Sequence, residues 1–301
     1  MAEMMSVAGE AAVLDRIHRA YKPYRNTRGR VGLLFELSSG GVGDGMVFGQ
    51  SVSLFRDPLK FAVDNVIPSV AKSAAKLVVL HLPSTKGSDT GYFRFDALAR
   101  LARLGLGIDR VSEWRDALRA IRGAGADVYV YLGSPRTRMT ESAVRSELDP
   151  YLAPGVGGVI LDAAEKSNRD TARSIRDAIP PGVGVGVEPR PPAGNASAAM
   201  QYRPSIVYDR AWWAFAASGR VLDRGWFRTD PDIYPPADPR RARARTHNLA
   251  GRGIEVVLSL VPPPGIRRPT RAIASALVGM GYTVLQYGYH PWWVDGDVWV
   301  V

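Results

Sequence analysis

Acidic side chains end several short apolar runs of this 301-residue sequence. Asp162 closes the run 158–161, Glu188 closes the run 183–187, and Glu165 follows Asp162 after two alanines. Cleavage of a glycosidic bond needs two carboxyl groups, because one protonates the leaving oxygen while the other acts as nucleophile, base or charge stabiliser. We therefore take Asp162, Glu188 and Glu165 as candidate catalytic residues.

The spacing of Asp162 and Glu188 suits such a pair. If their runs are neighbouring strands, about 4.8 Å apart, the two carboxyl groups would lie roughly 5 to 9 Å from each other, which covers both stereochemical outcomes. The alternative is structural. Asp162 then caps the following loop or helix, and Glu188, fixed by Pro189, pairs with an arginine such as Arg190.

A wider set of polar and aromatic residues lies at the ends of the other apolar runs. These candidate substrate-binding residues are Glu36, His81, Tyr208, Asp209, Trp212, Trp213, Gln286, Tyr287 and Trp292. Sugar rings present apolar C–H faces that stack on indole and phenol rings, so a glycan cleft would use such a lining. The alternative is that some of these aromatic residues only fill or cap the core.

Eight short apolar segments separated by amphipathic ones must position these residues. The expected strands are 31–37, 77–82, 127–132, 158–162, 183–188, 205–209, 254–260 and 282–287. The expected helices are 7–21, 58–75, 111–122, 141–152, 168–179 and 270–280. Apolar strands alternating with helices indicate a parallel sheet, and eight of them close a barrel. The sequence therefore predicts an α/β protein with a single (β/α)8 barrel of the TIM type.

The expected organisation is one domain. Residues 1–30 form an N-terminal helix and lead-in, and residues 31–301 form the barrel with an aromatic C-terminal tail. Because the tail does not show the pattern of an eighth helix, we expect the N-terminal helix to fill the gap between the last and first strands. The carboxyl ends of all strands would meet at one mouth, which gathers the candidate residues.

Composition narrows the chemistry. The sequence has no cysteine, which excludes disulfides, thiolate metal sites and cysteine nucleophiles. It has only four histidines, so few imidazole ligands are present for a metal ion. We expect no metal and no cofactor. The glycine-rich segment 40–45 lacks the Lys-Ser/Thr ending of a phosphate-binding loop, so a lid loop is favoured over a phosphosugar or nucleotide site.

Charge and hydropathy bear on partners. The net charge is +10, but the arginines are scattered apart from one run at 240–245, so solvated helix faces are favoured over a nucleic-acid site. Residues 1–10 lack the pattern of a signal peptide, and no apolar stretch reaches the about 18 residues of a membrane span. The expected location is the cytoplasm or a larger assembly, with neither nucleic acid nor membrane as partner.

With these strand ends in place, the chain distantly resembles the glycoside hydrolase family 18 chitinases. In that family strand six ends in a Tyr-Asp pair, and a tryptophan after strand eight forms the floor of the substrate site. Tyr208-Asp209 is similar to the pair, and Trp292 or Trp293 could stand for the floor. The resemblance implies a carbohydrate-active barrel.

Strand four departs from the family pattern D-x-x-D-x-D-x-E. The segment 157–165 keeps a terminal glutamate, Glu165, but has Ala163 where the assisting aspartate would lie, and Asp162 is out of register by one. Glu188 has no counterpart in that motif. An Asp162/Glu188 pair is therefore the favoured catalytic assignment, with Glu188 or Glu165 as proton donor.

Two readings remain open. The first is a glycan-cleaving enzyme that uses these strand-end carboxylates. The second is a catalytically inactive barrel that binds glycan or serves as a structural component of a larger assembly, such as a viral particle, with protein partners. The departure in strand four motivates the second reading.

Overall fold

The structure is a computed structural model of the chain. It describes residues 7–20, 29–36, 60, 62–81, 111–133, 141–142, 145, 157–162, 169–188, 201–209, 253–260 and 269–287. All statements below concern these residues.

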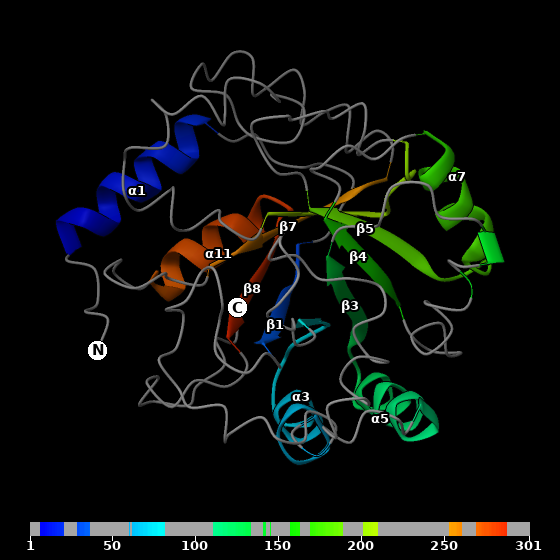
Figure 1. Cartoon of the computed structure of the whole chain (residues 1–301). Helices are drawn as coiled ribbons and strands as arrows, with labels where there is room; N and C mark the ends of the chain where they lie inside the picture. Colours follow the sequence, from blue (N-terminus) through cyan, green and yellow to red (C-terminus); the bar gives the residue numbers. More distant parts are fainter. Residues whose placement is uncertain are drawn as a thin grey trace, which may run out of the picture.

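Parallel strands close into a barrel in the order of the sequence (Figure 1). They are β1 (Val31–Glu36), β2 (Leu77–His81), β3 (Asp127–Gly133), β4 (Gly158–Asp162), β5 (Gly184–Glu188), β6 (Ile206–Asp209), β7 (Glu255–Ser259) and β8 (Thr283–Tyr287). Each strand is hydrogen-bonded to its sequence neighbours, and β1 pairs with β8. The predicted single (β/α)8 barrel is confirmed.

The strands are apolar on both faces because both faces are buried. On β1, Leu33 and Phe35 belong to the larger hydrophobic cluster, which includes residues of the helices, whereas Leu34 belongs to a smaller cluster made of strand residues alone. The larger cluster is the layer between sheet and helices, and the smaller one fills the barrel. Successive side chains of a strand alternate between the two.

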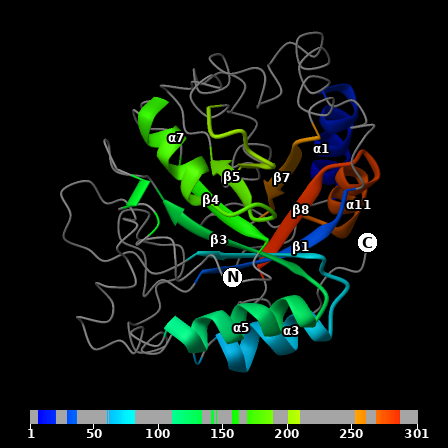
Figure 2. The ribbon, with the colours of Figure 1, turned by 90° about the vertical axis from the view of Figure 1, so that its right-hand side faces the viewer.

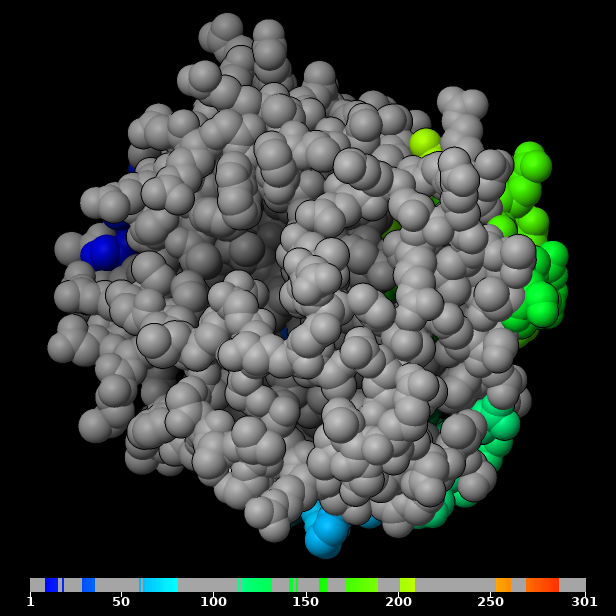
Figure 3. Space-filling view, viewed as in Figure 1, coloured from blue at the N-terminus to red at the C-terminus, as the bar shows by residue number. Residues whose placement is uncertain are grey.

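Helices surround the barrel. They are α1 (Val7–Ala20), α3 (Ile67–Ala71), α5 (Val111–Gly123), α7 (Arg169–Ala178) and α11 (Arg271–Gly279), and one π-helical turn, η2 (Ala62–Val66), precedes α3. Figure 2 shows α3 and α5 side by side on one side of the barrel, and the two helices are in contact. Parts of α1, α3, α5 and α7 lie at the periphery of the face drawn in Figure 3.

The helix expected over 58–75 is the element that differs most from the prediction. Its described part is Lys60, which is helical, and then the π turn and α3, which ends at Ala71. Pro68 lies in the first turn of α3 and has no backbone N–H, so it cannot donate the hydrogen bond that would continue a regular α-helix from the preceding residues. After the helix the Ser73 hydroxyl donates to the carbonyl of Val70 at 3.2 Å and accepts from the backbone N–H of Ala75 at 3.2 Å, which favours a turn there.

The other expected helices agree more closely with the structure. Those predicted over 7–21, 111–122, 168–179 and 270–280 are α1, α5, α7 and α11, with ends that differ by a residue or so. Of the helix expected over 141–152, residues 141, 142 and 145 are described, and they are helical. None of the described helices is long and apolar enough to cross a membrane.

The sheet closes by direct pairing of its first and last strands. Val31 to Leu34 of β1 lie opposite Val284 to Tyr287 of β8. Helix α1 packs against α11 outside this seam (Figures 1 and 2). The barrel wall is therefore held together by backbone hydrogen bonds, and α1 contributes to the helical layer that covers it.

Glycines on the inner face make room for a tyrosine. A Cβ at Gly158 would meet the carbonyl oxygen of Gly184 and the ring of Tyr129, and a Cβ at Gly184 would meet the Tyr129 hydroxyl. Tyr129 therefore fills the interior in front of two strands that carry no side chains at this level. The large side chain of Tyr129 thus occupies the space that side chains at Gly158 and Gly184 would need.

Candidate functional site

The carboxyl ends of the strands meet at one mouth. Asp162 and Glu188 are register partners at the ends of β4 and β5, and Glu36 and His81 are partners at the ends of β1 and β2. In (β/α)8 barrels this end carries the active site, because the loops that leave the strands surround it. For Glu36, His81, Asp162, Asp209 and Tyr287 the structure describes the backbone position only.

Glu188 is the strand-end acid whose side chain is described. It follows Val187, a residue of the outer cluster, and therefore lies on the inner face of β5. Its side chain is buried, with 6% of its surface exposed, and its carboxylate Oε2 accepts a hydrogen bond from the hydroxyl of Tyr131. A carboxylate held in a buried mouth has a fixed direction for proton exchange.

Tyr131 and Tyr208 form an aromatic pair inside the barrel below this mouth. Their ring centroids are 6.2 Å apart and the rings are inclined by 75°, an edge-to-face contact. Both side chains are fully buried. Tyr208, expected at the mouth as a substrate-binding residue, is thus a core residue of the barrel interior.

Two further polar residues at strand ends lie on opposite faces of the sheet. Ser259 follows Leu258 of the outer cluster, so it lies on the inner face at the end of β7, fully buried. Gln286 follows Leu285 of the inner cluster and therefore lies on the outer face, 2% exposed. This position takes Gln286 out of the mouth, because it belongs to the layer between sheet and helices.

The remaining candidates lie outside the described residues. They are Glu165, Trp212, Trp213 and Trp292, together with the glycine-rich segment 40–45. Within the ranges that the structure describes, no three His, Asp or Glu side chains are grouped so that they could hold a metal ion.

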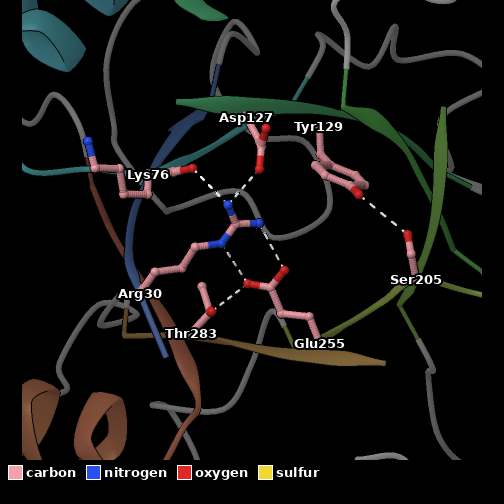
Figure 4. A network of polar contacts seen from close by, with 7 residues as sticks. All are labelled: Arg30, Lys76, Asp127, Tyr129, Ser205, Glu255 and Thr283. Carbon is pink, nitrogen blue, oxygen red and sulfur yellow. Dashed lines mark hydrogen bonds and ion pairs between the residues drawn. The ribbon is translucent and has the colours of Figure 1, made fainter. Parts of the chain in front are cut away.

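A second polar cluster fills the opposite, N-terminal end of the barrel (Figure 4). Arg30 donates from Nε and Nη2 to the carboxylate of Glu255, at 2.8 and 2.9 Å, and from Nη1 to Asp127 at 2.6 Å. The same Nη1 donates to the carbonyl of Lys76 at 2.9 Å, and the hydroxyl of Thr283 donates to Glu255 at 2.5 Å. Asp127, Glu255 and Thr283 are the first residues of β3, β7 and β8.

We call this network of Arg30, Asp127, Glu255 and Thr283 the ion-pair plug. In it the positive guanidinium faces two carboxylates, and each donor has an acceptor. Burial alone would lower the pKa of Arg30, but its hydrogen bonds and charge attraction to Glu255 and Asp127 outweigh burial and raise that pKa. Next to it, the Tyr129 hydroxyl is 3.3 Å from the hydroxyl of Ser205. Burial raises the pKa of Tyr129 above its ordinary value of 10.0, although the bond to Ser205 acts in the opposite direction.

Neither Tyr131 nor Arg30 was predicted from the sequence as a site residue. A signal for Tyr131 was present, because Tyr129 and Tyr131 stand two apart in an apolar strand and must share one face. The signal for Arg30 was weaker. Asp127 and Glu255 are charged residues at the start of apolar runs, which places them at the end of the barrel opposite to the candidate site.

No protein-family model and no curated protein matches the sequence. Similar solved structures include the tamarind chitinase-like lectin, with 10% identity, 87% of this chain and 95% of that chain covered, and a TM-score of 0.48. Tryptophan synthase from M. tuberculosis has 14% identity, with 92% of this chain and 87% of that chain covered, and a TM-score of 0.45. Dihydrodipicolinate synthase from Bacillus clausii has 10% identity, with 87% of this chain and 69% of that chain covered, and a TM-score of 0.41. Such low identities concern the fold and assign no activity.

Proposed function

We propose that the protein acts on glycans at the C-terminal mouth of the barrel, with Asp162 and Glu188 as its pair of carboxyl groups. The observation that carries the proposal is their register. The two acids end adjacent parallel strands as direct partners, and Glu188 is buried on the inner face with its carboxylate oriented by a hydrogen bond. Strand ends about 4.8 Å apart bring carboxyl groups within the roughly 5 to 9 Å that glycoside hydrolysis uses.

The proposed reaction is hydrolysis of a glycosidic bond. Glu188 gives its proton to the leaving oxygen as the bond to the anomeric carbon breaks, and Asp162 stabilises or captures the positive charge that develops there. Water then supplies a hydroxyl group to the anomeric carbon and returns a proton to the carboxyl pair. Glu165 is the alternative proton donor.

Around the pair, the proposal assigns sugar binding to residues at or after the other strand ends. Glu36 and His81 are hydrogen-bonding partners for sugar hydroxyls, and the aromatic rings are stacking platforms. Asp209 is left out, because it follows Tyr208 of the inner cluster and its position therefore alternates to the outer face of β6. The aromatic members are Trp212, Trp213, Tyr287 and Trp292. Tyr208 and Gln286 are excluded from this set, because one is a core residue and the other lies on the outer face of the sheet.

A second candidate function is glycan binding without cleavage. It is favoured by Ala163, which stands where the family 18 chitinases have their assisting aspartate. In that case the same mouth binds a glycan without cleaving it, and the barrel serves as a binding or structural part of a larger assembly. Binding and turnover are measured separately, so the two functions give different results.

The test is product release from a panel of polysaccharides and aryl glycosides by the wild type, Asp162→Asn and Glu188→Gln. Glu113→Gln is the matched control, because it makes the same acid-to-amide change on an exposed position of α5. We expect turnover by the wild type and the control, and a loss of about 1,000-fold or more in the two mouth variants.

Turnover that survives in both mouth variants would overturn the assignment of the carboxyl pair. Binding of a glycan without turnover, weakened by the mouth variants and unchanged by the control, would support the binding function instead. Neither binding nor turnover with any glycan would refute both.

A further inference from the structure

The hydrogen bond between Tyr131 and Glu188 joins strands that are not neighbours. Tyr131 is on β3 and Glu188 is on β5, with β4 between them. The phenol therefore reaches across the inside of the barrel, over Ile160, its own register partner on β4. The contact depends on these two side chains, because the backbone of β3 pairs with β4 and not with β5.

We propose that Tyr131 is a positioning residue for the reaction, because it fixes the carboxyl group of Glu188 in the direction needed for proton exchange with the substrate. This inference rests on the proposed function at the same mouth. A carboxylate on a two-carbon stem turns about its last bonds, and a hydrogen bond from a rigid phenol removes that freedom. Tyr131 itself touches no reacting atom.

The packing around Tyr131 holds the phenol rigid. Its ring is fully buried and makes an edge-to-face contact with the ring of Tyr208, which comes from β6 on the other side of Glu188. Edge-to-face contacts of this kind fix the angle between two rings. Strands β3, β5 and β6 thus each contribute one side chain to a single rigid unit of two phenols and a carboxylate.

An irregularity in the sheet coincides with this unit. The register between β3 and β4 shifts between Tyr131 and Gly133. Irregularities of pairing are common at the rims of barrels and next to active sites, where they change the direction of a side chain. On β5, Gly186 lies two residues before Glu188 on the inner face and leaves room for Ile160, because an added Cβ there would lie 2.7 Å from Cγ1 of Ile160.

Tyr131→Phe tests the role, with Tyr129→Phe as the matched control. Both variants remove one hydroxyl from the same strand, but Tyr129 contacts Ser205 near the other end of the barrel and not Glu188. We expect kcat of Tyr131→Phe to fall about 10- to 100-fold with KM changed less than about twofold, whereas Tyr129→Phe keeps both values within about twofold. Equal kcat values in Tyr131→Phe and Tyr129→Phe would overturn the proposal. So would a fall in kcat that is the same in both variants and accompanied by the same loss of thermal stability.

A second measurement does not depend on turnover. The hydroxyl proton of a buried tyrosine bonded to a carboxylate exchanges slowly and gives its own NMR signal. We expect such a signal in the wild type and in Tyr129→Phe, its absence in Tyr131→Phe, and a displaced signal in Glu188→Gln. If the wild type cleaves no glycan but shows this pattern, the proposed function fails and the contact stands; if the pattern is absent while turnover is present, the positioning role fails alone.

Discussion

Arg30 and Glu255 are separated by 225 residues, and the guanidinium of one grips both carboxylate oxygens of the other at 2.8 and 2.9 Å. The pair joins the segment before β1 to the start of β7, and Asp127 extends it to β3. The barrel is thus closed by an ion-pair plug at its N-terminal end. Its other end holds Glu188, the acid proposed to carry chemistry. The ion-pair plug and the proposed site thus lie at opposite ends of the same strands.

Replacing Arg30 with alanine should weaken the whole barrel. The change leaves Glu255 and Asp127 without their cation at a site where the Arg30 side chain is only 23% exposed. We expect the free energy of unfolding to fall by about 3 kcal/mol. Arg119→Ala, which breaks an exposed pair with Asp116 on α5, should cost less than about 1 kcal/mol. Urea unfolding of both variants measures the difference, and equal losses would contradict the plug.

Tyr129 should make stability depend on pH in the alkaline range. Its pKa is higher in the folded protein than the ordinary value of 10.0, so above pH 10 the unfolded chain binds fewer protons than the folded one. Its stabilising contribution is therefore complete below pH 10 and is lost as pH rises through the folded pKa.

We expect the stability difference between wild type and Tyr129→Phe to shrink in this range by up to about 1.4 kcal/mol per pH unit. Unfolding free energies of both proteins at several values between pH 9 and about 11 provide the measurement. Parallel curves for the two proteins would contradict the burial of this phenol.

Gly158→Ala should disrupt the barrel wall. The added Cβ would lie against the carbonyl oxygen of Gly184 and 2.5 Å from Cε1 of Tyr129, and neither atom can move without shifting a strand or a buried ring. We expect a loss of about 3 kcal/mol. Gly123→Ala, at the end of α5 with nothing within 4 Å of the new Cβ, should be neutral or stabilising by up to about 1 kcal/mol. The reverse order of the two melting temperatures would contradict the packing described here.

The two proposed carboxyl roles can be separated by the leaving group. A dinitrophenyl group departs without protonation, so Glu188→Gln should lose about 10-fold on a dinitrophenyl glycoside but about 1,000-fold on an alkyl glycoside. Asp162→Asn should lose about 1,000-fold on both, because its charge is needed whatever group departs. Steady-state rates on the two substrates decide between the roles. The opposite pattern would exchange the assignments of Asp162 and Glu188.

The strands could be predicted from the sequence because their signal is local. A segment such as 77–82 is apolar apart from His81, since its strand is buried on both faces, and β2 occupies Leu77–His81 of it. The helix expected over 58–75 was less accurate. Its apolar pattern does not reveal that Pro68 follows a π turn or that the Ser73 hydroxyl bonds the carbonyl of Val70.

The candidate site could be predicted only in part. The position of Glu188 at the end of a strand is visible in the sequence, but its contact with Tyr131, 57 residues earlier, depends on which strands face each other inside the barrel. The face on which Gln286 lies follows from its alternation with Leu285, which becomes clear only once the inner cluster is known. Contacts between distant segments are set by closure of the sheet and not by local pattern.

The most direct test of the account is to map glycan binding onto the barrel by NMR, using backbone amide signals during titration with oligosaccharides. We expect the shifts to gather at Glu188, Tyr131 and Ser259, at or near the carboxyl ends of their strands, while Arg30 and Glu255 stay unchanged. This result is expected whether the bound glycan is cleaved or only held. Shifts gathered around Arg30 and Glu255, or no shift with any oligosaccharide, would contradict a glycan site at this mouth.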